Sequence, residues 1–141
     1  EAGVIAKLAE EGVVVIAAGG GGVPVVEDED GMLRGIDAVI DKDLSTAILA
    51  VETKARRIIN LTQTEMVYRN YGSPNETGLS EMRVAEAKRY LSEGHFAPGS
   101  MGPKIEGAIE FLERGGEEVI ITTPELIGEA LGGRAGTRVL P

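Results

Sequence analysis

Apolar residues along the chain occur both in continuous runs and at helical spacing, the pattern of strands that alternate with helices. The run Val13–Ala18 is apolar throughout, which predicts a strand buried on both faces of a sheet. Shorter runs at 57–61, 119–122 and 137–140 predict three further strands. Helices of about ten residues between such strands are typical of crossover connections. We therefore expect an α/β fold with an open, mainly parallel sheet and helices on both faces.

The expected helices carry boundary signals. The chain opens within a helix that Gly12 ends, and Asp41 is expected to cap the next one. Ser80 is expected to cap a helix that Gly94 stops, and Pro103 suits the first position of the helix that follows. A short helix is expected from 125 to 131.

Two segments predict local excursions from this pattern. Val23–Val26 and the residues at 32–34 flank an acidic turn that ends in Asp-Gly, which is typical of a β-hairpin. We interpret the acidic run at 27–30 as a solvated hairpin tip, with a magnesium ligand as the alternative. The segment 62–79 is rich in Asn, Gly, Ser and Pro and predicts a run of turns.

Composition narrows the classes of protein and partner. The 141 residues suit a single domain with one core. A net charge of −9 argues against nucleic acid or an anionic membrane as the main partner, but a local group of amides and lysines can still hold phosphates. The absence of Cys excludes disulfides and thiolate metal sites. With no signal peptide and no apolar run of about 18 residues, we expect a cytoplasmic protein.

Four consecutive glycines directly follow the expected buried strand: Gly19, Gly20, Gly21 and Gly22. Their backbone amides are not covered by side chains, so an anion can lie against them. A tight turn into the hairpin needs only one or two glycines, and we therefore favour anion binding over a plain turn.

Two lysines lie at expected helix starts, where free amides and the helix dipole favour a phosphate. Lys42 could meet that phosphate while Asp43 orients a lysine, although capping alone explains an acidic first turn better. Lys104 follows a small-residue loop that lacks P-loop spacing, so a solvated lysine fits equally well.

The single histidine and the three tyrosines are weaker candidates for a functional role. The single His95 cannot build a zinc site by itself, and it fits a packed or surface residue better than a general base. Tyr68, Tyr71 and Tyr90 are interpreted as packing groups rather than stacking platforms.

Taken in order, these segments resemble the carbamate kinases of the amino-acid kinase superfamily. The matching stretches are A-A-G-G-G-G-V-P-V at 17–25, A-V-I-D-K-D-L at 38–44, E-A-K-R-Y at 86–90, E-G-H-F-A-P-G-S-M-G-P-K at 93–104 and I-I-T-T at 120–123. The stretch at 93–104 is long and the most specific of them, and the resemblance covers nearly the whole chain.

The resemblance implies a homodimer that transfers a phosphoryl group reversibly between ATP and carbamate, with Mg²⁺, giving ADP and carbamoyl phosphate in arginine catabolism. Lys42 and Lys104 would contact the transferring phosphoryl group, and Asp43 would hold the lysines in place. Gly19 to Gly22 would lie near the acceptor. The residues that would border the nucleotide are Leu61, Thr62, Gln63, Thr64, Met66, His95, Ser100, Met101 and Pro103. No residue is assigned as a metal ligand.

The sequence departs from the family pattern in two ways that bear on its expected nucleotide binding and activity. Gln63 stands where the family usually has a carboxylate. The family's N-terminal half, with a first glycine loop and most of the carbamate pocket, has no counterpart here. We expect residues 1–141 to be the C-terminal ATP-binding part, which alone binds nucleotide weakly and turns over nothing. The alternatives are an amino-acid kinase with another acid substrate and a nucleotide-binding or regulatory module without catalysis.

Overall fold

A four-stranded sheet organises the chain in a computed structural model that describes all residues from Glu1 to Pro141. Its strands, in the spatial order β3-β7-β8-β6, are β3 (Arg57–Leu61), β7 (Glu118–Thr122), β8 (Thr137–Leu140) and β6 (Glu81–Arg83). β3 pairs with β7 and β6 pairs with β8 in parallel, whereas β7 and β8 run antiparallel. The sheet is therefore mixed, with the parallel pairings in the majority.

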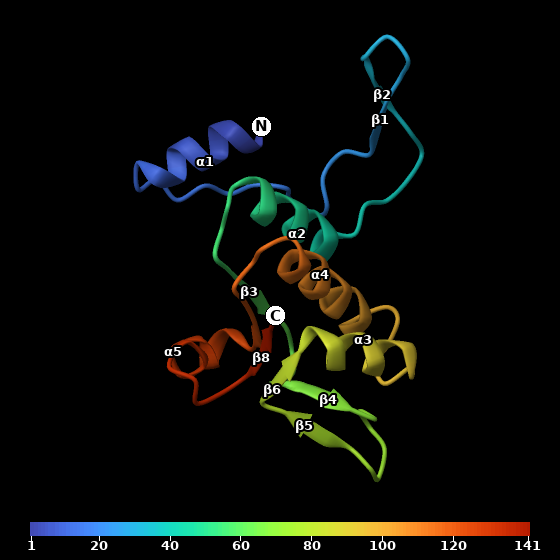
Figure 1. The fold of residues 1–141 in the computed structure, drawn as a ribbon, viewed down its shortest axis with the longest axis vertical. Coiled ribbons are helices and arrows are strands. Elements are labelled where there is room, and N and C mark those ends of the chain that lie inside the picture. The colour runs from blue at the N-terminus through green and yellow to red at the C-terminus, as the bar shows by residue number, and fades with distance from the viewer.

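Helices cover both faces of the sheet, as expected. They are α1 (Ala2–Glu10), α2 (Lys42–Glu52), α3 (Val84–Ser92), α4 (Met101–Glu113) and α5 (Ile127–Leu131), which the 3-10 turn η1 (Pro124–Leu126) precedes. In Figure 1, α2, α3 and α4 lie on one side of the strands and α5 lies on the other. All five residues of β7 are buried, because this inner strand is covered from both sides. The helices are all too short or too polar to cross a bilayer.

Two predicted features at the start of the chain are confirmed. Asp41 caps α2, because its carboxylate accepts a hydrogen bond from the Asp43 amide at 2.7 Å. β1 (Val25–Glu27) and β2 (Leu33–Gly35) form the expected antiparallel hairpin, which extends away from the rest of the chain in Figure 1. Asp28 organises its turn, and hydrogen bonds from the Arg34 side chain and the Met32 amide lower the pKa of that carboxyl.

The predicted buried strand at Val13–Ala18 is wrong. These residues belong to no strand, and Val14 and Ile16 are 92% and 97% exposed. A buried strand needs a ladder partner and cover on both faces. β3 is the edge of the sheet on this side, but its only partner is β7. The apolar run thus has the composition of an inner strand, but no strand of the sheet pairs with it.

Three boundaries also differ from the predictions. The segment 62–79 is not only turns, because it contains a second hairpin, β4 (Val67–Arg69) with β5 (Thr77–Leu79). α3 starts at Val84 and not after a Ser80 cap, because residues 81–83 stay extended to pair with β8. Pro103 is the third residue of α4, where a missing N–H is still harmless.

Candidate active site

One nearly buried carboxylate, that of Asp43 in the first turn of α2, brings two lysines together. The ammonium of Lys104 lies 3.1 and 3.2 Å from its two oxygens, and that of Lys42 lies 4.0 Å from Oδ2. The Asn60 side-chain amide donates to Asp43 Oδ1 at 3.0 Å. The side chain of Lys104 is 12% exposed and that of Lys42 is 63% exposed. One ammonium is thus fixed and the other is free to move beside the same carboxylate.

Close packing of α2 against α4 makes this contact possible. A Cβ at Gly107 in α4 would lie 2.8 Å from the carbonyl oxygen of Asp43, so only glycine fits there. Lys104 lies three residues before Gly107, on the same face of the helix. The absence of a side chain at Gly107 therefore sets how near Lys104 comes to Asp43.

The glycine run lies against the start of α2. Gly21 is buried with a φ of 144°, and a Cβ there would come within 2.0 Å of the Ile40 carbonyl oxygen. Its own carbonyl accepts a hydrogen bond from the Ser45 hydroxyl. The structure therefore brings this run to the helix end that carries Lys42, although 20 residues separate them in the chain.

A cavity of about 340 Å³, here called the Thr62 cavity, opens where β3 ends. Three segments form its walls: the residues after β3, the β4–β5 hairpin, and the loop that leads into α4. Its lining residues are Thr62, Gln63, Thr64, Tyr68, Tyr71, His95, Phe96, Ala97, Ser100 and Met101. The volume lies in the range of small-molecule sites, and in α/β sheets ligands bind beyond the carboxyl ends of strands.

Most of the residues predicted to border a nucleotide line this cavity. They are Thr62, Gln63, Thr64, His95, Ser100 and Met101. Leu61, Met66 and Pro103 are not in its wall, and neither are Gly19, Gly20, Gly21 and Gly22. Leu61 closes β3, and Pro103 lies inside the first turn of α4.

The sequence interpretation missed some side chains of the site. Tyr68 and Tyr71 line the cavity with ring centroids 5.7 Å apart. Tyr68 is half-buried, whereas Tyr71 is 66% exposed and does not pack into the core. Tyr90 is buried in the core, as expected. Asn60 was also missed, although its place near the carboxyl end of a predicted strand was a usable signal.

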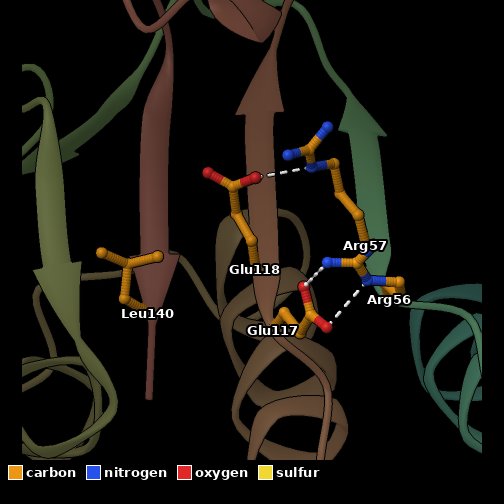
Figure 2. A pocket seen from close by; sticks show the side chains of 5 residues that line it. All are labelled: Arg56, Arg57, Glu117, Glu118 and Leu140. Atoms are coloured by element: carbon orange, nitrogen blue, oxygen red, sulfur yellow. Dashed lines mark hydrogen bonds and ion pairs between the residues drawn. The ribbon is translucent and has the colours of Figure 1, made fainter.

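A second cavity, of about 480 Å³, lies at the opposite ends of β3 and β7 and is lined by charged pairs (Figure 2). Arg56 donates two hydrogen bonds to Glu117, at 2.8 and 2.9 Å, and Arg57 donates to Glu118 at 2.5 Å. The hydrogen bonds from Arg56 lower the pKa of Glu117, and the same contact raises the pKa of Arg56. Each guanidinium already has a carboxylate, so this cavity offers a phosphate no free cation.

Glu118 in this second cavity should matter more for stability than its neighbour Glu117. Its side chain is 8% exposed and forms ion pairs with Arg57 of β3 and with Arg138 of β8, the second at 3.0 Å. We expect Glu118→Gln to lower the free energy of unfolding by about 1–3 kcal/mol, because two guanidinium groups lose their counter-charge. Urea unfolding followed by circular dichroism measures this. Glu117→Gln is the matched control, since its pair is exposed and should contribute little; equal losses in both variants would contradict the assignment.

Comparison with known families matches residues 1–123 to the amino acid kinase family. The chain belongs to that family. Two curated relatives in it are the carbamate kinase-like protein YahI of Escherichia coli and a carbamate kinase of Thermococcus kodakarensis. They are 50% and 51% identical to the chain, each over 140 residues.

A solved structure from the same family agrees with the fold described above. Carbamate kinase from Giardia lamblia bound to AMP-PNP is 41% identical, with a TM-score of 0.93 over 99% of the chain. The match covers 49% of that protein, and the two curated relatives are each covered to 44%. The chain thus spans less than half the length of these relatives. The predicted amino-acid kinase fold is confirmed.

Proposed function

We propose that the chain is the nucleotide-binding part of a carbamate kinase, which moves a phosphoryl group reversibly between ATP and carbamate. The relatives named above support the reaction, and the AMP-PNP complex of the Giardia protein supports the nucleotide. The observation that carries the proposal is the shared contact of Lys42 and Lys104 with Asp43, beside the glycine run. The proposal includes the cytoplasmic homodimer and the part in arginine catabolism that the resemblance implies.

The arrangement suits phosphoryl transfer, which depends on alignment and on positive charge around the transferring oxygens. Lys104 is held by both Asp43 oxygens, so its charge is fixed before a ligand arrives. Lys42 is mostly exposed and can follow a phosphoryl group as it moves. Asp43 is a positioning residue in this scheme, because it keeps two like charges beside each other.

The nucleotide base and sugar are assigned to the Thr62 cavity. Tyr68, Tyr71 and Phe96 give it aromatic walls, and Thr62 and Gln63 offer polar groups. Ser100 and Met101 of its wall lead directly into α4, which carries Lys104 one turn further on. A nucleotide in the cavity would therefore have its phosphates near the N-terminus of this helix.

Magnesium enters the proposal only with the nucleotide. Mg²⁺ is usually held by one or two carboxylates together with substrate phosphates and water. No three His, Asp or Glu side chains gather in the structure, and Asp43 is already paired. The proposal therefore assigns the ion no protein cage and routes no step through it.

Calorimetry with ADP tests the nucleotide assignment on the 141-residue chain itself. We expect weak, saturable binding that Lys104→Ala weakens roughly 10-fold or more, because a charge-assisted contact is lost. Lys88→Ala is the matched control, since Lys88 is half exposed and pairs with Glu113 on the surface. ADP binding that survives Lys104→Ala undiminished would remove the phosphate role of this lysine.

A further inference from the structure

We propose that His95 is a positioning residue that ties the β4–β5 hairpin to the loop before α4 and so fixes the aromatic wall of the Thr62 cavity. The inference rests on the proposed function, because the cavity is taken as the nucleotide site. It differs from a direct contact with the nucleotide, since both ring nitrogens of His95 are occupied by protein groups.

The tie is formed by two hydrogen bonds. Nδ1 of His95 lies 2.8 Å from the side-chain oxygen of Asn70, which follows β4. Nε2 lies 3.0 Å from a carboxylate oxygen of Glu93, just after α3. Asn70 has a φ of 52°, a left-handed conformation that Asn tolerates better than most residues. The contact thus joins two segments that are 25 residues apart in the chain.

What the tie holds is the aromatic wall. Tyr68 and Tyr71 flank Asn70 in the hairpin, and both line the cavity. Phe96, the loop residue next to His95, also lines the cavity. His95 therefore sits between the two aromatic sides of the cavity, with a side chain that is only 20% exposed.

Each ring nitrogen of His95 faces a side-chain oxygen. An N–H on either nitrogen therefore has an acceptor. A flipped Asn70 amide would set its oxygen against the Asn75 carbonyl, to which the amide nitrogen now donates at 3.4 Å. Glu93 is the one ionised group in direct contact. Behind the ring, Tyr90 packs edge-on at 5.6 Å, with the guanidinium groups of Arg69 and Arg89 against the tyrosine at 5.1 and 4.9 Å.

Only the bond to Asn70 reaches the hairpin. Glu93 lies two residues from His95 in the chain, and its carboxylate orients the ring from the loop side. Loss of the imidazole should therefore loosen the hairpin and lower the affinity for ADP.

The experiment compares the 141-residue chain with His95→Gln, which keeps one amide donor, and with His95→Ala. We expect His95→Ala to weaken ADP binding roughly 3- to 10-fold, as judged by calorimetry, and His95→Gln to restore part of it.

Hydrogen exchange of the hairpin amides at 67–69 and 77–79 tests the tie without a ligand. Protection factors should be lower in His95→Ala than in the wild-type chain, and the effect of His95→Ala should vanish in an Asn70→Ala background. Failure of the wild-type chain to bind ADP would overturn the proposed function and leave exchange to decide on the tie. If ADP binds but neither affinity nor protection responds to substitution of His95, the inference is wrong and the function stands.

Discussion

Replacing Lys104 with Met should lower phosphoryl transfer roughly 100- to 1,000-fold, by analogy with the removal of one fixed donor from a charge-stabilising site. Lys104 is nearly buried and held by both oxygens of Asp43, so its charge acts where little water screens it. The activity is measured in a chimera that carries this chain in place of the matching part of the Thermococcus kodakarensis carbamate kinase. ATP formed from ADP and carbamoyl phosphate is the readout.

The controls separate catalysis from folding. Lys88→Met removes a lysine that is half exposed and should leave turnover unchanged. Thermal unfolding of the Lys104→Met chimera shows how much of the loss comes from leaving Asp43 with fewer partners. A folded Lys104→Met chimera that keeps most of its activity would contradict the assignment. An unsubstituted chimera that folds and binds ADP without turnover would favour the alternative of a nucleotide-binding module without catalysis. The neutral Gln63 in the cavity wall is the feature of the chain that favours this alternative.

The elements that the sequence predicted well are those with local signals at both ends. The strand at 57–61 and the Asp41 cap of α2 are found as predicted, because an apolar run and a capping carboxylate act within a few residues. The Val13–Ala18 run failed because burial depends on strands that pair with it, which a local pattern does not reveal. Abundant turn residues at 70–76 hid the short β4–β5 hairpin, in which Val67 is buried and its amide donates to the Thr137 hydroxyl.

The site was predictable in its residues but not in its assembly. Lys42 and Lys104 were each ambiguous in the sequence, since a solvated lysine at a helix start has the same local pattern. Their convergence rests on a contact across 61 residues, which no spacing rule gives. The resemblance named segments that the structure brings together at Asp43 and at the Thr62 cavity. The structure added Asn60 and the two hairpin tyrosines, because only folding places them beside the predicted residues.

Gly107→Ala should destabilise the chain and loosen the site together. In a helix interior, Ala is normally more favourable than Gly by about 1 kcal/mol. Here the new Cβ would lie 2.8 Å from the Asp43 carbonyl oxygen, a backbone atom that cannot rotate away. α2 and α4 must separate, so we expect the free energy of unfolding to fall by about 1–3 kcal/mol. Lys104 moves with α4, and ADP binding should weaken as its contact with Asp43 lengthens.

Gly128→Ala in α5 is the matched control, because a Cβ at Gly128 would meet no atom within 4 Å. It should leave stability unchanged or slightly higher, and ADP binding unaffected. Urea unfolding and calorimetry on both variants decide the matter. A Gly107→Ala chain as stable as the Gly128→Ala chain would show that the two helices have room to spare. In that case the distance from Lys104 to Asp43 would be set by the ion pair itself, and the proposed phosphate site would depend on charge rather than on helix packing.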